Sequence, residues 1–351
     1  MLRYLLRRLA WTIPTFLGIT LLVFAAARAA PGNAATVAHG GSESAEGSAE
    51  IAARSARYRA EYLLDQPLWK QYLHFLGPFD LSASGHPRFG GTGAHPWHGL
   101  LAFDFGREYG RPSIPVGEEI QRRLAVTAPL ALAAILLAYL VAIPIGVLAA
   151  VRRGSWIECA LTLGLFGLHA APPFWIGTMA ILLFGAAGLG WLPVVGLHGR
   201  EADALPPLAR AWDTLLHAIL PVLALSLPML AYLSRQVRGA MIEALGSDYV
   251  RAARARGIRE SSVVLRHALR NSLLPLITLA SGVLPAAIGG SVVVETVFAI
   301  PGMGRYAYEG LLARDLNVIL ATTTVSAALT FAALLLADLA YAVADPRIRH
   351  A

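Results

Sequence analysis

Residues 235–271 read RQVRGAMIEALGSDYVRAARARGIRESSVVLRHALRN and lie between two long apolar runs. Eight of them are arginine, and only three are acidic. An arginine near the centre of a membrane helix costs about 2.5–3.5 kcal/mol even on a lenient insertion scale, so we expect this segment to stay out of the bilayer. Short loops rich in Lys and Arg mark the cytoplasmic side of membrane proteins, which predicts that the segment faces the cytoplasm.

The composition of the whole chain fits a protein with several membrane spans. Its 351 residues are 56% hydrophobic and 15% charged, and the mean hydropathy is +0.57, whereas a soluble domain carries roughly 25% charged residues. The net charge of +7 would suit nucleic acid, but the basic residues gather beside the apolar runs and indicate membrane topology instead. The single cysteine, Cys159, excludes an intramolecular disulfide and a thiolate cluster, and we expect it to be buried.

Six apolar segments are predicted to cross the membrane, which makes this an all-α integral membrane protein with both termini in the cytoplasm. Residues 1–30 hold a basic N-terminus and the first span, whose uncharged run is longer than the 7–15 residues of a signal-peptide core, so we expect an uncleaved helix. Residues 124–351 form a core of five spans that includes the cytoplasmic loop 235–271. These spans lie at 124–151, 156–189, 215–233, 273–294 and 318–344.

The polar stretch 31–123, between the first two spans, is expected to be an extracytoplasmic insert. It contains patches rich in Gly, Ser, Pro and His, while residues 51–76 carry apolar positions at helical spacing. Several histidines in the insert invite comparison with a metal site. No i, i+4 pair or compact ligand set occurs among them, so we predict no metal site.

Prolines and ionisable residues interrupt two of the predicted spans. Pro172 and Pro173 follow each other in the third span and should break or kink its helix. His169, one turn earlier, could be a proton relay, but a neutral imidazole bonded to a carbonyl freed by the kink is the preferred interpretation. Asp338 in the last span is expected to pair with a neighbouring helix or to lie near the inner interface.

Within the arginine-rich segment, defined as residues 235–271, the pattern predicts two short helices joined at Gly257. The first covers 249–256, and Gly257 suits the left-handed residue that ends a helix. The second covers 263–269. Serine and aspartate side chains precede both helices as candidate N-caps, namely Ser247 or Asp248 for the first and Ser261 or Ser262 for the second.

Small residues and cations alternate along the first of these helices, which indicates a docking surface. Ala252, Ala253 and Ala255 would leave room for a partner, and the flanking arginines would fix its orientation. A loop that is basic only to set topology is the alternative. It accounts for the charge but not for the alanine cluster or the central glycine.

The same residues resemble the coupling loop of permease subunits in bacterial ABC importers, and in particular the first permease of the dipeptide/oligopeptide/nickel group. The resemblance rests on DYVRAARARG at 248–257 and HALRN at 267–271. Arg251 and Arg270 stand where the general motif has glutamate and proline, as is common in the peptide branch. Further pieces in the same order along the chain are APG at 30–32, LDQP at 64–67, DFG at 104–106, GWLP at 190–193, VETVF at 294–298, PGMGR at 301–305 and DPRIR at 345–349.

This resemblance implies the type I fold of ABC importer permeases, placed in the bacterial cytoplasmic (inner) membrane. It implies that the chain forms half of a translocation pathway for peptides, with a homologous second permease, two cytoplasmic ATPase subunits and an extracytoplasmic solute-binding protein as partners. The chain has no GxxxxGK[ST] phosphate loop, and Lys70 is its only lysine. We therefore expect no enzyme activity and no bound cofactor in this chain, with ATP and Mg²⁺ bound by the ATPases.

Nickel, glutathione or another small solute is the alternative cargo, and a secondary transporter or channel is the alternative class of protein.

Two sets of residues are candidates for function on the basis of this resemblance. Candidate pathway residues are Pro172, Pro173, Gly282, Gly289 and Gly290. Candidate ATPase-coupling residues are Asp248, Tyr249, Arg251, Ala252, Ala253, Arg254, Ala255, Arg256, Gly257, Val263, Arg266, His267 and Leu269.

Overall fold

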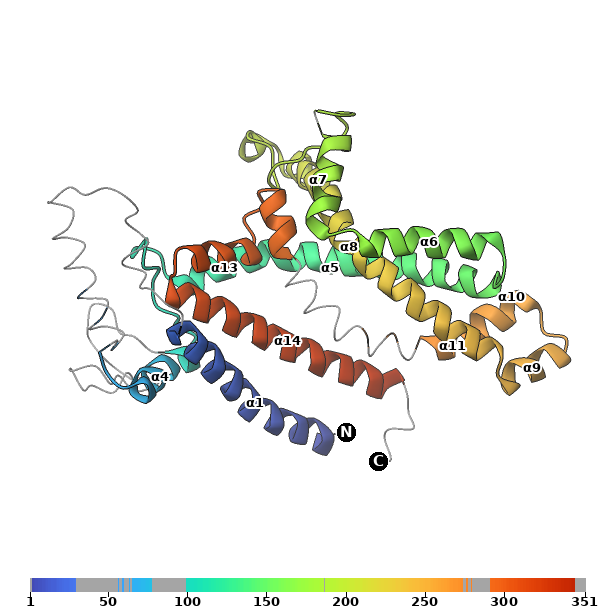
Figure 1. Cartoon of the computed structure of the whole chain (residues 1–351), viewed down its shortest axis with the longest axis horizontal. Helices are drawn as coiled ribbons and strands as arrows, with labels where there is room; N and C mark the ends of the chain where they lie inside the picture. The colour runs from blue at the N-terminus through green and yellow to red at the C-terminus, as the bar shows by residue number, and fades with distance from the viewer. Residues whose placement is uncertain are drawn as a thin grey trace. The chain divides into compact units, whose positions relative to one another are not determined.

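The computed structural model is helical (Figure 1). It divides into two compact units. It describes residues 2–29, 65–77, 99–185, 187–273 and 291–344, together with the single residues 56, 59, 63, 276 and 279. The core unit comprises residues 1–4, 125–305 and 329–351, and the insert unit comprises residues 5–124 and 306–328. Within the described residues the only bridge of β type joins Arg107 to Pro115.

Apolar helices dominate the described part of the chain, as the composition predicts. Four of its helices are long and apolar enough to cross a membrane, and the pair α6 and α7 makes a fifth if it is counted as one bent span. Most of the predicted fifth span, 273–294, lies outside the described residues, as do most of the insert and the C-terminal tail. Six spans and an external insert therefore remain predictions. The four helices are α1 (Leu2–Ala29), α5 (Val116–Val151), α8 (Pro207–Leu245) and α14 (Leu316–Ala344).

In the insert unit, α4 (Leu68–Leu76) packs on α1 through aromatic side chains. Phe24 of α1 lies 5.5 Å from the ring of Tyr72 and 5.9 Å from that of Phe75, measured between centroids. The Tyr72 hydroxyl also donates to the carbonyl oxygen of Leu17 at 3.1 Å. The helical spacing at 51–76 thus corresponds, in its described part, to a short helix that covers the first span.

Buried carboxylates connect the rest of this unit to α13 (Met303–Leu312) and to the start of α14. Glu108 accepts a hydrogen bond from the Tyr306 hydroxyl at 2.8 Å. Asp315, only 4% exposed, accepts from the backbone N–H of Tyr109 and of Asn317. Residues 104–116, which precede the second span, are therefore attached to the turn that precedes the last one.

The double proline breaks the third span as predicted. α6 (Trp156–Ala170) ends before Pro172, α7 (Pro173–Phe184) begins at Pro173, and the two helix axes differ by 102°. Proline at the first position of a helix loses no hydrogen bond, because that N–H would have no partner within the helix. His169 is exposed and forms no hydrogen bond with the described residues, and Cys159 is exposed as well, so both expectations about their surroundings were wrong.

α8 is the central helix of the core unit and is longer than the sequence predicts. Both α6 and α7 contact it, and α5 approaches it at Gly146, where an added Cβ would lie 2.5 Å from the Cβ of Val237. The predicted fourth span ends at Leu233, but the helix continues to Leu245 and stops only at Gly246. Most of the residues in between are good helix formers, and the one glycine, Gly239, lies inside the helix without ending it.

Candidate functional site in the arginine-rich segment

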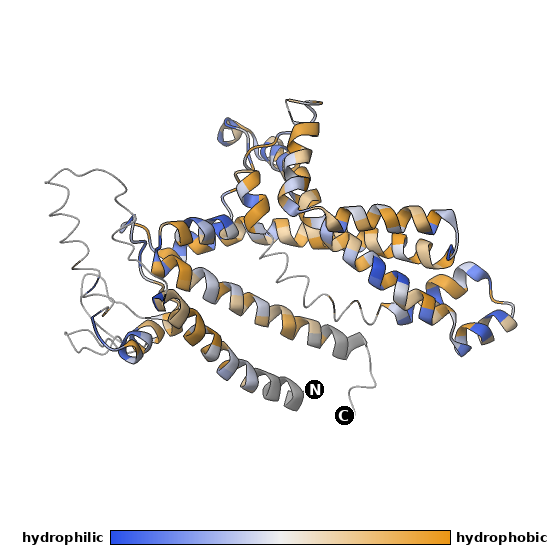
Figure 2. Ribbon diagram, in the orientation of Figure 1, coloured by the Kyte–Doolittle hydropathy of each residue, from blue (hydrophilic) through white to orange (hydrophobic). Residues whose placement is uncertain are grey.

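The arginine-rich segment begins as a direct continuation of α8. Leu233, Val237 and Met241 are completely buried and follow one another at helical spacing. Arg235 and Arg238, which the sequence assigns to a loop, lie on the same helix. Figure 2 shows hydrophilic residues gathered on the last turns of α8 and on the helices that follow.

The first predicted helix is α9 (Asp248–Ala255), and it ends as expected. Gly257 has φ +71°, and its N–H donates to the Arg254 carbonyl oxygen at 2.9 Å. A Cβ added to Gly257 would meet nothing within 4 Å. The requirement for glycine is therefore conformational rather than steric.

The predicted N-cap of α9 differs from the structure. Ser247 occupies the N-cap position, but its hydroxyl donates to the Ala244 carbonyl oxygen at 2.5 Å and caps no backbone N–H. Asp248 forms an ion pair with Arg251, one turn along the helix. The serine hydroxyl thus bonds back to the end of α8, to a carbonyl oxygen that also accepts the Ser247 N–H at 3.2 Å.

The second predicted helix begins earlier and is irregular. It runs from Glu260 as α10 (Glu260–Ser262), passes through a π-helical turn (Val263–Ala268) and ends as α11 (Leu269–Ser272). Arg259 is the residue before it, so Ser261 and Ser262 lie inside the helix and neither caps it. A π turn contains one residue more than the α-helical register allows, and such turns are frequent at functional sites.

Both helices pack against the end of α8 in one hydrophobic cluster. Val250 and Ala253 of α9 and Val263 and Ala268 of the π turn are all completely buried, and they belong to the same cluster as Met241. Ala253 was expected on the docking face, but it faces inward, because it lies on the α9 stripe that Val250 begins. Its small side chain allows close packing within the segment. The end of α8, α9 and residues 260–272 therefore form one packed body.

The outer face of this body combines exposed apolar groups with arginines. Tyr249 is 40% exposed and Leu265 is 60% exposed. Arg254 donates to both carboxylate oxygens of Glu260, at 2.7 and 3.1 Å, and this bonding lowers the pKa of Glu260. Of the candidate coupling residues, nine are exposed, His267 and Leu269 are half-buried, and Ala253 and Val263 are buried. The exposed nine are Asp248, Tyr249, Arg251, Ala252, Arg254, Ala255, Arg256, Gly257 and Arg266.

An ion pair that sequence reasoning missed attaches the turn between α5 and α6 to α8. The Glu158 carboxylate accepts from Arg238 Nε at 2.7 Å, while its other oxygen accepts the Gly154 N–H at 2.5 Å. Ser155 caps α6 by accepting the Glu158 N–H at 3.3 Å. The Ser-x-x-Glu spacing could have predicted where α6 begins, but no sequence signal identifies Arg238 as the partner.

The candidate pathway residues are only partly described. Pro172 and Pro173 form the break between α6 and α7, while Gly282, Gly289 and Gly290 lie outside the described residues. No contact in the described part of the chain tests whether any of them lines a pathway. Their role remains a prediction.

A buried carboxylate explains the Pro-Gly-Met-Gly turn at 301–304, which at the level of sequence is only one piece of the family resemblance. Glu295 is 1% exposed and accepts from the Thr127 hydroxyl at 2.6 Å and from the Arg305 N–H at 2.8 Å. Thr127 in turn accepts the Met303 N–H at 2.8 Å. A Cβ at Gly302 would lie 2.2 Å from the carboxyl carbon of Glu295, so a larger residue there would have to displace the hydrogen-bonded carboxylate.

Comparison with known proteins gives matches along the whole chain. The family model described as the binding-protein-dependent transport system inner membrane component matches residues 142–350. The chain is 36% identical over 350 residues to the oligopeptide transport system permease protein AppB of Bacillus subtilis, covering 100% of both. It is 35% identical over 370 residues to the dipeptide transport system permease protein DppB of Escherichia coli K12, covering 100% of this chain and 99% of the relative.

Proposed function

Because this chain belongs to the family of binding-protein-dependent transport system inner membrane components, we propose that it imports peptides and that its arginine-rich segment receives the movement of an ATPase. Membership of this family makes the chain a permease subunit of an ABC importer, which is a multi-pass inner-membrane protein and is not itself an enzyme. The cargo, the coupling and the identity of the partners are the proposal.

The observation that carries the coupling proposal is the single packed body at the end of α8. Val250, Ala253 and Val263 bury their side chains in the cluster that also holds Val237 and Met241. A force applied to the outer face would therefore move α8 with it, since a packed interior transmits displacement instead of absorbing it. An ATPase that closes on ATP could in this way tilt a membrane-spanning helix of a chain that has no nucleotide site.

The exposed groups support a protein partner on this face. An exposed aromatic residue, Tyr249, and an exposed aliphatic one, Leu265, belong to the same segment as several exposed arginines. Aromatic and arginine side chains are enriched at protein interfaces. The partners proposed are two cytoplasmic ATPase subunits, a homologous second permease and an extracytoplasmic solute-binding protein. Peptides are the proposed cargo because the relatives are named for oligopeptides and dipeptides.

The test uses the complete importer in proteoliposomes, with ATP hydrolysis and peptide uptake measured together. Leu265→Asp should lower both rates about tenfold or more, as expected for the loss of an interface residue worth at least 1.4 kcal/mol. Leu208→Asp is the matched control, because Leu208 is 85% exposed at the opposite end of α8. Wild-type rates in Leu265→Asp would refute the assignment of this face.

The cargo is tested separately in the same vesicles. Unlabelled dipeptides and oligopeptides should compete with a labelled peptide for uptake, whereas nickel and glutathione should not. Competition by nickel or glutathione alone would replace peptides with that solute. ATP-independent uptake by the purified chain would instead favour a secondary transporter or channel.

A further inference from the structure

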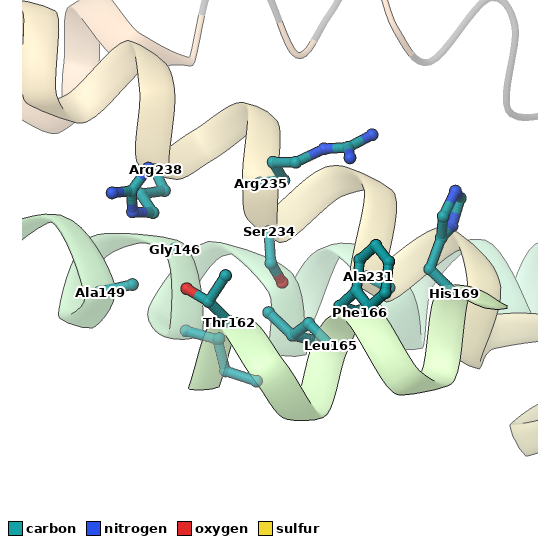
Figure 3. Close-up of a pocket in the computed structure, with 11 residues that line it drawn as sticks. Gly146, Ala149, Thr162, Leu165, Phe166, His169, Ala231, Ser234, Arg235 and Arg238 are labelled. Carbon is teal, nitrogen blue, oxygen red and sulfur yellow. The ribbon is translucent and has the colours of Figure 1, made fainter. Parts of the chain in front are cut away.

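A pocket of about 130 Å³ lies between α5, α6 and α8 in the core unit (Figure 3). Its walls are mainly apolar and include Ile145 and Ala149 of α5, Leu165 and Phe166 of α6, and Ala231 of α8. An engineered apolar cavity of about 150 Å³ accommodates benzene, whereas pockets for whole small-molecule ligands measure roughly 300–1,000 Å³. The pocket therefore fits one end of an apolar chain but not a peptide.

The pocket lies beside the close crossing of α5 and α8. Gly146 brings the two helices together, since an added Cβ would be 2.8 Å from the Ser234 carbonyl oxygen. α6 has no buried residue and contributes Thr162, Leu165 and Phe166 as the third wall. A tight crossing on one side and a loosely packed helix on the other leave space between them.

A buried hydroxyl in this pocket lacks a partner. Ser234 is 1% exposed, lines the pocket, and has no hydrogen-bonding partner for its Oγ among the described residues. In Figure 3 its hydroxyl points from α8 toward α6. Two other buried serines bond to carbonyl oxygens of their own helix, Ser226 to Leu223 at 3.0 Å and Ser272 to Ala268 at 2.9 Å. A buried polar group without a partner costs free energy, so this hydroxyl indicates a ligand oxygen.

The mouth of the pocket carries an unbalanced positive charge. Arg238 is paired with Glu158, but Arg235 is exposed and forms no ion pair with the described residues. His169, also exposed, lies at the same edge and adds no negative charge (Figure 3). An occupant that joins an apolar chain to an anion would match both the walls and the mouth.

We propose that this pocket binds one anionic phospholipid of the cytoplasmic leaflet. Its phosphate pairs with Arg235, an ester oxygen accepts the Ser234 hydroxyl, and the first part of an acyl chain lies against Leu165 and Phe166. The inner leaflet supplies such lipids, and basic pockets between helices on the cytoplasmic side are where their head groups bind. This proposal rests on the cytoplasmic placement of the segment, but not on its coupling to an ATPase.

Lipid retention by the complete importer tests the proposal, measured by native mass spectrometry after incubation with phosphatidylglycerol or with phosphatidylcholine of the same chains. The wild type should retain phosphatidylglycerol at least about fivefold more firmly, roughly the contribution of one arginine near a membrane surface. Arg235→Gln should lose that preference. Arg259→Gln is the matched control, because Arg259 is an exposed arginine of the same segment that does not line the pocket.

Two further variants separate the chain subsite from the head-group subsite. Thr162→Leu, which fills the pocket from α6, should weaken retention of both lipids, whereas Thr178→Leu, on an exposed position of α7 outside the pocket, should not. Ser234→Ala should weaken retention without changing the preference between lipids. Because uptake is not measured, a failure of the coupling proposal would leave these results unchanged.

Four results would overturn the proposal. They are equal retention by Arg235→Gln and wild type, equal retention of the two lipids by wild type, displacement of the lipid by inorganic phosphate, and displacement by a transported peptide. Displacement by phosphate would identify a site for a free anion. Displacement by peptide would identify a part of the cargo pathway.

Discussion

Charged residues serve opposite purposes in the arginine-rich segment and at the Pro-Gly-Met-Gly turn. In the segment, ion pairs such as Arg254 with Glu260 lie on the surface, at 43% and 59% side-chain exposure, while the interior is purely apolar. At the turn, one carboxylate, Glu295, lies in the interior and receives hydrogen bonds from Thr127 and Arg305. Surface ion pairs contribute little stability, so they are not what holds the segment together, and its exposed arginines can meet a partner. The buried carboxylate, by contrast, holds a turn in place.

The largest effect should come from the buried side of this comparison. Gly302→Ala would place a methyl group 2.2 Å from the Glu295 carboxyl carbon and force the turn apart. We expect a loss of about 2–3 kcal/mol in stability, from overpacking and from strained hydrogen bonds. Thermal unfolding in detergent measures it. Gly239→Ala is the control, because nothing lies within 4 Å of a Cβ there. Equal melting temperatures for the two variants would show that Glu295 does not hold the turn against Gly302.

Neighbouring alanines separate the interior of the segment from its surface. Ala253→Leu should cost about 1–3 kcal/mol by overpacking a site with no exposed surface. Ala252→Leu, at an exposed position, should leave stability unchanged and should lower ATP hydrolysis in the assembled importer. The unfolding temperature and the rate of ATP hydrolysis, measured on both variants, test this difference between the two alanines. The reverse pattern would show that the outer and inner faces of α9 are wrongly assigned.

A smaller effect is expected where only the backbone is strained. Gly257→Val places a β-branched residue at φ +71° and should cost about 1–2 kcal/mol, without a steric clash. Gly257→Asn should cost less, because asparagine tolerates this conformation. Amide hydrogen exchange in α9 measures the loosening. Unchanged exchange in Gly257→Val would show that the link between the two helices does not depend on its geometry.

The smallest effect concerns the surface ion pair. Arg254 lowers the pKa of Glu260, so the pair stabilises the folded protein above the ordinary glutamate pKa, and this contribution is lost as the pH falls through the lowered value. Between pH 8 and pH 6, Glu260→Gln and wild type should therefore differ by a constant and small amount in unfolding temperature. A difference that changed across this range would point to another titrating group.

Local signals predicted the features that depend on one or two residues. The consecutive prolines at 172–173 predicted the break, and Gly257 predicted the left-handed end of α9, because proline and glycine restrict or permit the backbone whatever surrounds them. The length of α8 was missed because the end of an apolar run was taken for the end of a helix. Met241 and Ala244 continue both the helix and its buried face.

Features that depend on contacts between distant residues could not be predicted. Glu158 and Arg238 are eighty residues apart in the sequence, and their opposite charges alone do not show that they pair with each other. The inward position of Ala253 depends on which face of a short helix meets α8, and the spacing of alanines and arginines does not fix this. Glu295 directly follows the predicted fifth span, and nothing in the sequence marks it as a buried hydrogen-bond acceptor, because its partners belong to a preceding helix and to a turn that follows.

The π turn at Val263–Ala268 has a consequence for insertions and deletions. Each residue added to or removed from an α-helix turns everything beyond it by about 100°. Losing one residue here would regularise the helix and rotate Leu269–Ser272, taking Ser272 out of the interior where its hydroxyl bonds to Ala268. Related chains should therefore keep the length of this stretch even where its exposed side chains differ.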